Sequence, residues 1–293
     1  MVKVSATHGN DTLNRLADGL CYGDRDDRPY GDAGNNRATM GVFGLPLICT
    51  ASLKDAEGLV GNHVSRRPST PFLVTFANPL GVKLVTSDPA YDANIRRMDL
   101  VFCDGIALAW AARWIGRYPM ERISFDSTGI APSVFRIAEE HGRSIALVGG
   151  HPGVAAAAAE RIRESFPGAR IVAAMDGYRH VADLIRTTID LNPDIVICGM
   201  GAPRQEAFLA ALADAGWCGA GFTCGGYFDH LVGRFDFYPA IINRLNLRWL
   251  YRLAREPRRI GYRCVVEYAP FWRSIAWELV HSALSSHRSS RRS

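Results

Sequence analysis

Apolar runs recur along most of the chain, with longer stretches of mixed polarity between them. The runs are rich in Val, Ile, Leu, Phe and Ala, and they begin at Val42. Short runs without polar positions are typical of strands buried on both faces of a parallel sheet. The strand-like runs lie at 42–50, 72–77, 99–103, 144–149, 170–174, 194–199 and 219–224.

The stretches between these runs have the mixed polarity of amphipathic helices. A strand followed by a helix, repeated several times, predicts an α/β fold in which a parallel sheet carries helices on both faces. The expected helices lie at 79–97, 105–116, 127–141, 153–166, 180–191 and 203–216.

The alternation ends near Tyr227, and the chain then contains two helical segments at about 240–255 and 264–284. Pro257 separates them, because proline lacks a backbone donor and clashes with the preceding turn. The second segment is amphipathic by its spacing. Its predicted apolar face consists of Val265, Tyr268, Trp272, Ile275, Ala276, Leu279 and Ala283.

Polarity also divides the 293-residue chain into three parts. Residues 1–38 are expected to form a flexible leader, in which Asp24–Arg25–Asp26 is interpreted as a solvated loop and not as a metal-binding DxD motif. Residues 39–239 are expected to form the α/β core. Residues 240–293 are expected to form a basic, amphipathic helical appendage and tail.

The net charge of +5 is unevenly distributed. From Arg244 to Ser293 there are 11 arginines and 3 acidic residues, a net charge of +8, whereas the rest of the chain has 23 basic and 26 acidic residues, a net charge of −3. A basic tail on a nearly neutral body indicates an anionic partner. Basic residues and Trp on an amphipathic helix are typical of a membrane interface, and we favour this interpretation over a helix packed only on its own domain.

The seven cysteines form no CxxC pair and show no metal-ligand spacing. This usage favours a reducing cytosol over a disulfide scaffold. The chain also shows no signal-peptide core and no run of about 18 apolar residues free of charge. These features predict a cytoplasmic protein without a membrane span.

The stretch DLVFCDGIALAW places Asp104 and Gly105 directly after a strand-like run and directly before a helix. One interpretation is structural, because Asp before Gly is good turn chemistry and a carboxylate caps the free N–H groups of a helix. The other is functional, because ligands of parallel α/β sheets bind just outside the carboxyl ends of strands. The stretch alone leaves both interpretations open.

Two glycine-rich turns also follow strand-like runs. VGGHPG contains Gly149 and Gly150, and CGMGAPRQE contains Gly201 and Gln205. A glycine-rich turn that leads into a helix exposes N–H groups to an anion, which makes these residues candidates for phosphate binding. Such glycines often serve packing alone in α/β proteins, so this alternative stays open.

Motifs for several other chemistries are missing. The chain contains no HExxH, GxSxG or GxxxxGK[ST] motif, and no clean GxGxxG follows a strand. What remains is a well-placed carboxylate, phosphate-compatible turns and many arginines. This set suits a transfer reaction in which the carboxylate deprotonates an acceptor hydroxyl, while Arg and N–H groups stabilise a phosphate leaving group. We expect no metal and no cofactor.

A series of motifs extends over about residues 40 to 270 in the order TFANP, MDLVFCDGIALAWAAR, ERISFD, LVGGHPGV, DGYR, GMGAPRQE, GGYFDHLVG and RWLYRLAREPRR. In this series the chain resembles the WecG/TagA/CpsF family of bacterial cell-envelope glycosyltransferases. The resemblance implies a Rossmann-like core with a C-terminal membrane-associating appendage. It also implies transfer of a sugar, such as N-acetylmannosamine or a hexose, from a UDP-sugar to a polyprenyl-diphosphate-linked acceptor in exopolysaccharide or cell-envelope polysaccharide synthesis.

The resemblance further implies roles for single residues. Asp104 matches the family's proposed general base, and Thr75 and Asn78 match the polar pair beside it, with one extra residue between them here. Arg122 matches an arginine that follows the second helix, and Gln205 matches the glutamine of the PxQE turn. Arginines of the appendage would close over the diphosphate, as a metal does in other enzymes: Arg252, Arg258, Arg259 and Arg263.

The chain departs from the family pattern in three places. In the family pattern a glycine follows a Glu-Arg pair, and this glycine is missing in ERISFD. The family's usual Lys-Arg-Ala-Pro stretch is replaced by residues 236–239. Arg248 stands where a glutamate usually precedes the appendage Trp. The first two departures indicate a different acceptor or sugar. The third changes the contacts expected of that helix.

The implied partners are a UDP-sugar donor, a lipid-linked diphosphate-sugar acceptor and the inner face of the cytoplasmic membrane, with no nucleic acid. The sequence leaves the oligomeric state open, a homo-oligomer included. Two other functions fit parts of the sequence. One is a non-catalytic membrane- or polyanion-binding protein that uses the basic tail. The other is a nucleotide-dependent oxidoreductase, for which the fingerprint glycines are lacking.

Overall fold

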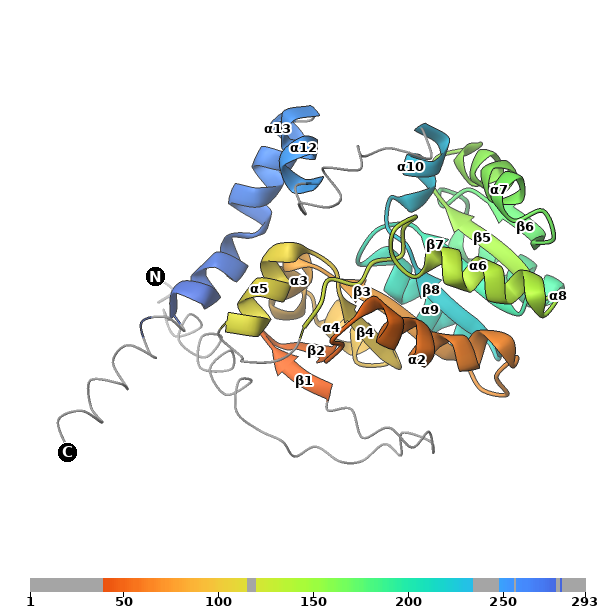
Figure 1. The fold of residues 1–293 in the computed structure, drawn as a ribbon, viewed down its shortest axis with the longest axis horizontal. Coiled ribbons are helices and arrows are strands. Elements are labelled where there is room, and N and C mark those ends of the chain that lie inside the picture. Colours follow the sequence, from red (N-terminus) through yellow and green to blue (C-terminus); the bar gives the residue numbers. More distant parts are fainter. Residues whose placement is uncertain (1–38, 115–119, 234–247, 256, 278–279, 281–293) are drawn as a thin grey trace, which may run out of the picture.

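The computed structural model describes residues 39–114, 120–233, 248–255, 257–277 and 280. Its centre is a sheet of six strands in the order β4-β3-β8-β7-β5-β6, and every neighbouring pair is parallel. The predicted parallel sheet is therefore confirmed (Figure 1). The strands are β3 (Phe72–Ala77), β4 (Leu100–Cys103), β5 (Ser144–Gly149), β6 (Arg170–Met175), β7 (Ile195–Gly199) and β8 (Ala220–Thr223).

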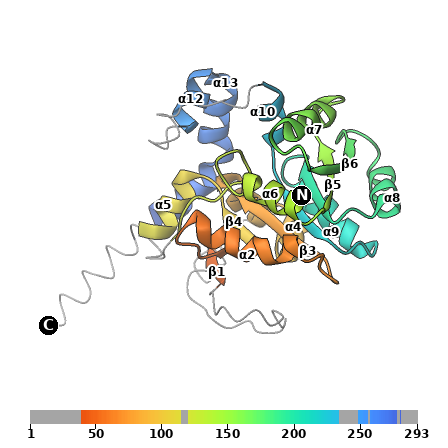
Figure 2. The ribbon, with the colours of Figure 1, turned by 45° about the vertical axis from the view of Figure 1, so that its right-hand side comes forward.

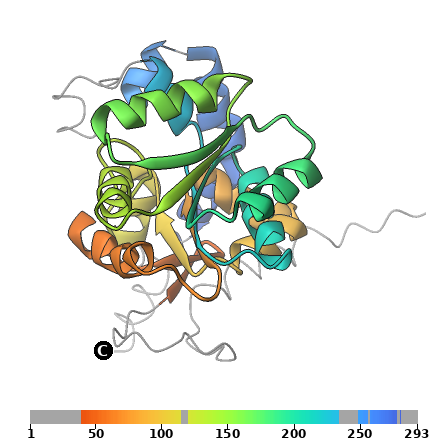
Figure 3. The ribbon, with the colours of Figure 1, turned by 90° about the vertical axis from the view of Figure 1, so that its right-hand side faces the viewer.

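Helices cover both faces of this sheet, as predicted, because alternate side chains of each strand point to opposite faces. In β3, for example, Val74 lies in one buried cluster and Leu73 in the other. Figure 3 shows helices on opposite sides of the strands. One cluster contains residues of α2 (Leu53–Ser65), α6 (Ala131–Glu140), α7 (Val154–Ser165) and α10 (Tyr227–Gly233). The other contains residues of α3 (Pro79–Ser87), α4 (Pro89–Ile95), α5 (Ile106–Trp114), α8 (Val181–Leu191) and α9 (Arg204–Asp214).

The strand order reverses between β5 and β7. After β5 the chain crosses one face of the sheet through α7 to reach β6, whereas after β7 it crosses the other face through α9 to reach β8. The loops that follow β5 and β7 therefore leave the sheet in opposite directions. In open α/β sheets such a topological switch point is where ligands bind, at the carboxyl ends of the strands.

The prediction for the first apolar run, 42–50, was wrong. It forms a two-stranded antiparallel hairpin from β1 (Thr39–Val42) and β2 (Leu45–Ile48), outside the parallel sheet. Phe43 and Gly44 make the turn with φ of 50° and 79°. Two successive residues in the left-handed region make the kind of tight turn that joins antiparallel strands.

Helix boundaries also differ from the predicted ones. The expected helix 79–97 is two helices, because Pro89 begins α4 and the Asp88 side chain caps it by accepting from the N–H groups of Ala90 and Tyr91. The helices α2 and α10 were not predicted. The start of α2 is fixed by Ser52, whose side chain accepts from the Asp55 N–H.

The C-terminal segment is helical but interrupted. It contains α12 (Arg248–Arg255), α13 (Pro257–Tyr262), the π-helical turn η1 (Arg263–Glu267) and a helix over residues 269–277. The predicted end of the first segment near residue 255 agrees with the structure, whereas α13, which begins at Pro257, was not predicted. The leader 1–38 and residues 240–247 lie outside the described residues, and in the described ones no helix is both long and apolar enough to cross a membrane.

The predicted apolar face of this segment is only partly correct, because the π-helical turn shifts the helical register. Val265 is exposed, whereas Phe271, which the spacing did not place on that face, is fully buried. Its ring contacts Phe43 edge-on with 5.6 Å between ring centroids. Phe271 therefore fixes the helix 269–277 to the core, and Figures 1 and 2 both show this helix beside α5.

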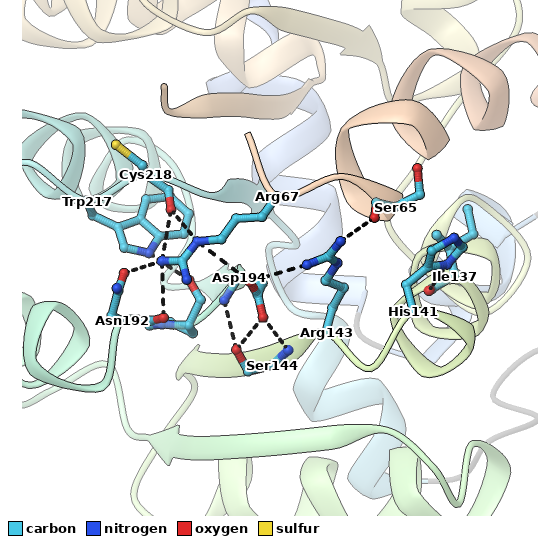
Figure 4. A network of polar contacts seen from close by, with 11 residues as sticks. Ser65, Arg67, Ile137, His141, Arg143, Ser144, Asn192, Asp194, Trp217 and Cys218 are labelled. Carbon is cyan, nitrogen blue, oxygen red and sulfur yellow. Dashed lines mark hydrogen bonds and ion pairs between the residues drawn. The ribbon is translucent and has the colours of Figure 1, made fainter. Parts of the chain in front are cut away.

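A group of polar residues at the amino ends of the strands forms what we call the amino-end network (Figure 4): Arg67, Arg143, Ser144 and Asp194. Asp194 accepts hydrogen bonds from the Ser144 N–H at 2.8 Å and the Ser144 hydroxyl at 2.6 Å. Arg67 and Arg143 lie 3.6 and 3.9 Å from the same carboxylate. These contacts join the beginnings of β5 and β7 at the end of the sheet opposite the switch point.

Candidate active site

Asp104 stands at the carboxyl end of β4, where an arginine binds it. Its backbone N–H donates to Ala77 O at 2.7 Å, which keeps the ends of β4 and β3 together. Arg122 Nη1 donates to Asp104 Oδ1 at 3.1 Å. The backbone beside Arg122 is itself fixed, since the Ile123 N–H donates to Cys103 O at 2.8 Å. The structure thus brings together two of the predicted site residues, Asp104 and Arg122.

Arg122 also belongs to a short polar chain. Its Nη1 donates to the Ser124 hydroxyl at 3.1 Å, and that hydroxyl donates to Asp126 Oδ2 at 2.7 Å. The guanidinium lies 3.9 Å from the same Asp126 carboxylate. Arg122 is therefore held between two carboxylates, which orients the side chain that faces Asp104. Asp126 was not predicted as a site residue, although it falls in the ERISFD motif.

The backbone conformation at position 105 explains why a glycine follows the Asp104 carboxylate. Its φ is +116°, a value that side chains rarely tolerate, and a Cβ there would lie 3.3 Å from Pro79 Cδ and 3.7 Å from Asn78 Cβ. The turn after β4 therefore packs directly on the turn after β3. Asn78 lies in that second turn, where its side-chain oxygen accepts from the Leu80 N–H at 2.9 Å and caps α3.

A buried polar cluster lies near the carboxyl ends of the strands, on the side of the sheet that α9 covers. Glu206, in the first turn of α9, is 1% exposed. Its Oε1 accepts from the Thr75 hydroxyl at 2.9 Å and from Gln205 Nε2 at 3.0 Å. The Thr75 hydroxyl also lies 2.8 Å from the Thr223 hydroxyl, and Gln205 Oε1 accepts from the Gly225 N–H at 3.1 Å. This cluster connects the middle of β3 with the end of β8 and the first turn of α9.

Burial raises the pKa of Glu206, and the hydrogen bonds that it accepts from Gln205 and Thr75 only partly oppose this. Thr75 and Gln205 were predicted as site residues, whereas Glu206, which is their shared partner, was not. The available signal was an acidic residue in the first turn of a helix at a strand end. The structure places Thr75 in this cluster and Asn78 against the Asp104 turn, so the predicted polar pair is divided between two neighbouring positions.

The predicted glycines meet at the switch point. A Cβ on Gly149, whose φ is +149°, would lie 2.5 Å from the backbone of Gly199. The Gly150 N–H donates to Gly199 O at 3.1 Å, so the loops after β5 and β7 touch. Gly201 has a φ of +75° and open space where its Cβ would be. Close approach of the loops requires Gly149, while Gly201 serves the turn into α9.

An exposed aromatic and a cation lie beside these loops. The rings of His151 and Tyr178 stack with centroids 4.5 Å apart and an angle of 18°. Arg204 lies over the Tyr178 ring at 5.7 Å and donates to Gly177 O at 2.5 Å. Tyr178 is 61% exposed, so the aromatic pair that it forms with His151 lies at the surface beside the switch point. None of these three residues was predicted, although they fall in the motifs LVGGHPGV, DGYR and GMGAPRQE.

Comparison with known families matches residues 40–284 to the family described as "Glycosyl transferase WecG/TagA/CpsF family". The chain belongs to this family. The resemblance drawn from the motifs is confirmed, and with it the assignment as a hexosyl- or N-acetylhexosaminyl-transferase.

Characterised relatives in the family act on lipid-linked sugars. The chain is similar to the UDP-Gal:alpha-D-GlcNAc-diphosphoundecaprenol beta-1,4-galactosyltransferase of Shigella boydii, with 31% identity over 68% of this chain and 83% of the relative. It is similar to the N-acetylglucosaminyldiphosphoundecaprenol N-acetyl-beta-D-mannosaminyltransferase of Bacillus spizizenii, with 31% identity over 64% of this chain and 72% of the relative. The enzyme of the same name from Staphylococcus aureus is 24% identical over 78% of this chain and 89% of the relative.

The arginines that the family resemblance assigned to the appendage are only partly described. The side chains of Arg252 and Arg259 lie outside the described residues, although α12 and α13 contain both positions. Arg258 is exposed on α13. Arg263 lies 3.5 Å from Glu267 in the π-helical turn and over the ring of Tyr268 at 5.8 Å. Figures 1 and 2 show α12 and α13 on the same side of the molecule as α10.

In the ranges that the structure describes, no three His, Cys, Asp or Glu side chains come together in an arrangement that would hold a metal ion. Asp24 and Asp26 lie outside these ranges.

Proposed function

We propose that this enzyme transfers a sugar from a UDP-sugar to a hydroxyl of a lipid-diphosphate-linked sugar, with Asp104 as the general base. The observation that carries the proposal is the position of Asp104 at the carboxyl end of β4, held by Arg122 at 3.1 Å. The relatives named above support the substrate classes, since their names specify UDP-Gal and diphosphoundecaprenol-linked N-acetylglucosamine.

In the proposed reaction Asp104 takes the proton of the acceptor hydroxyl as the hydroxyl oxygen attacks the anomeric carbon of the donor. The bond between that carbon and the diphosphate oxygen breaks, and UDP leaves with the bonding electrons. Arg122 keeps the carboxylate in position through its contacts with Asp104 and Ser124. Apart from the Gly150 N–H, which donates to Gly199 O, backbone N–H groups in the turns that contain Gly150 and Gly201 are suited to the charge of the departing diphosphate.

The sheet order indicates how the donor lies. Asp104 follows the edge strand β4, whereas the switch point lies between β7 and β5. Three to four strand spacings separate them, which is roughly 14–19 Å at about 4.8 Å per spacing. A UDP-sugar consists of base, ribose, diphosphate and sugar in series, so it suits this separation. We place the uracil on Tyr178 and His151 and the sugar toward Asp104.

The residues between these two ends have positioning roles in this proposal. Gln205 donates to Glu206 and accepts from the Gly225 N–H. These bonds order the carboxyl ends of the central strands, which the diphosphate crosses in this proposal. Thr75 supports the same carboxyl group from β3. Asn78 keeps the turn beside Asp104 in place by capping α3.

The C-terminal part belongs to the same proposal. Residues 39–239 form the transferase core, and residues 240–293 form a basic appendage that meets the inner face of the membrane. Arg252, Arg258, Arg259 and Arg263 act from this appendage on the diphosphate. The charge of +8 between Arg244 and Ser293 supports both roles, since phosphate groups are present at the membrane surface and in the substrates.

Substitution of the base tests the reaction. Asp104→Asn is expected to lower turnover by about 100-fold or more, the usual contribution of a general base, while UDP still binds. Asp183→Asn, which removes an exposed carboxylate that pairs with Arg186 on α8, is the matched control and is expected to keep full turnover. The assay follows UDP release with a diphosphoundecaprenol-linked N-acetylglucosamine acceptor.

Two outcomes would count against the proposal. Near-normal turnover in Asp104→Asn would contradict the assignment of the base. UDP is expected to stabilise the folded protein against thermal unfolding whereas NAD is not, and absence of stabilisation by UDP would contradict the proposed donor.

A further inference from the structure

We infer that α5 contacts the lipid bilayer through its outer face, formed by Trp110, Arg113 and Trp114, while the acceptor sugar is held at Asp104. This inference rests on the proposed function for the nature of the acceptor. It concerns a surface of the core that the helix 269–277 of the appendage extends.

The two faces of α5 differ sharply in their exposure. Leu108, Ala109, Ala111 and Ala112 are buried in the core. The outer face carries two of the largest apolar side chains, since Trp110 is 54% exposed and Trp114 is 83% exposed. Residues spaced by three and four positions lie on one side of a helix, so Trp110, Arg113 and Trp114 form one face. The inner face already accounts for the packing of α5.

The chemistry of this face matches the boundary between lipid and water. Tryptophan has a large apolar ring with one N–H at its edge, and it is enriched at the interface between the membrane and water. Arg113 is exposed between the two indoles and supplies a positive charge for anionic headgroups. The charge of this face is therefore complementary to a bacterial membrane surface.

The position of α5 relative to the site agrees with a lipid-linked acceptor. The helix begins at Ile106, two residues after Asp104. With a rise of about 1.5 Å per residue, Trp110 lies about 6 Å and Trp114 about 12 Å along the helix from its first residue, Ile106. Moreover β4 is an edge strand, so the donor proposed to lie across β3 and β8 leaves this edge of the sheet to the acceptor. A hydroxyl bound at Asp104 is separated from its prenyl chain by one sugar and a diphosphate.

A neighbouring helix strengthens the same surface. The helix 269–277 lies beside α5 in Figures 1 and 2, and its Trp272 and Trp277 are also exposed. Phe271 packs into the cluster that contains the inner face of α5. The two helices are thus fixed to one core, and both present indoles to the outside.

The test compares vesicle binding of the intact chain and its variants. The double variant Trp110→Ala with Trp114→Ala is expected to lower the partition onto vesicles of phosphatidylglycerol and phosphatidylcholine by about tenfold or more, because two large apolar rings lose their place in the interface. Leu191→Ala, which shortens an exposed apolar side chain on α8, is the control and is expected to bind as wild type. Thermal unfolding is expected to be unchanged in all variants, because the substituted side chains are exposed.

Two further measurements complete the test. UDP binding by the double variant is expected to equal that of wild type, while transfer to the full-length prenyl acceptor in vesicles falls with vesicle binding. Unchanged vesicle binding in the double variant would overturn the inference. So would sedimentation that shows a dimer in wild type and a monomer in the double variant, since the face would then bind a second copy of this chain. Vesicle binding requires no sugar transfer, so a failure of the proposed reaction would be recognised separately.

Discussion

Replacement of Glu206 by alanine leaves two buried donors without their shared acceptor. The Thr75 hydroxyl and Gln205 Nε2 both donate to Glu206 Oε1, at 2.9 and 3.0 Å. A buried donor that loses its partner costs about 1–3 kcal/mol, and Thr75 falls at the low end of this range because it keeps Thr223 at 2.8 Å. We expect the free energy of unfolding of Glu206→Ala to fall by about 2–4 kcal/mol.

Glu206→Gln separates the hydrogen bonds from the ionisation. The amide oxygen of glutamine accepts from the same two donors, and the side chain is never charged. Burial raises the pKa of Glu206 in the folded protein, whereas the unfolded chain ionises at about 4.3. The folded state therefore holds a proton that the unfolded state has lost, and the stability of wild type falls as pH rises from about 4.3 to the folded pKa.

Glutamine has no such titration, so Glu206→Gln is expected to become more stable relative to wild type as pH rises through that window. Tyr91 and Cys198 lie within reach of the Glu206 charge, and burial is the main reason that the pKa of each is raised, so both remain neutral at neutral pH. Urea denaturation of the three proteins at several pH values gives the midpoints and slopes. An alanine variant as stable as wild type, or a glutamine variant whose difference from wild type does not change with pH, would refute this reasoning.

Three other predictions concern separate parts of the molecule. Gly149→Ala is expected to lower the unfolding midpoint strongly, because its Cβ would lie 2.5 Å from the backbone of Gly199, and an unchanged midpoint would contradict the close approach of the two loops. Tyr178→Ala is expected to weaken UDP binding by about tenfold in calorimetry whereas Tyr178→Phe keeps it, because the ring supplies the stacking; equal loss in both variants would argue against stacking. For Asp194, burial alone would raise the pKa, but hydrogen bonds from Ser144 and the two nearby arginines outweigh it and lower the pKa. The stability that this carboxylate contributes is therefore fully present above pH ~3.9, the pKa of Asp in the unfolded chain, and is lost as pH falls through the folded pKa. Asp194→Asn should be less stable than wild type at neutral pH, and the difference should shrink in acid. A difference that does not change with pH would be inconsistent with the assignment.

The sequence was sufficient for the parallel sheet, because buried strands without polar positions form a pattern that few other structures produce. It was not sufficient for the hairpin at 39–48, since an apolar run conceals a turn made by Phe43, a residue rarely found at positive φ. The helix α2 was missed because Gly58 and Gly61 weaken its helical signal, and its stability comes from packing of Ala56, Val60 and Val64 in the core.

The candidate site shows a similar limit. Asp104 and the glycine turns were accessible because strand ends can be located from local pattern alone. The partnership of Glu206 with Thr75 was not accessible, since the two residues are 131 positions apart and meet only when β3 and α9 pack together. Tyr178 was missed for a related reason. An exposed tyrosine in a loop carries no signal until the strand order places that loop beside the switch point.

The amino-end network and the candidate site occupy opposite ends of the same strands. Asp194 and Ser144 join the beginnings of β5 and β7, while the proposed donor site extends along the other ends of the strands, from the loops after β5 and β7 to Asp104 after β4. Substitutions at that end of the sheet, including those near Asp104 where the sugar is proposed to lie, therefore leave the contacts between Asp194 and Ser144 intact. A scaffold built this way is free to exchange one donor sugar for another during evolution, and relatives that transfer galactose and N-acetylmannosamine illustrate that freedom.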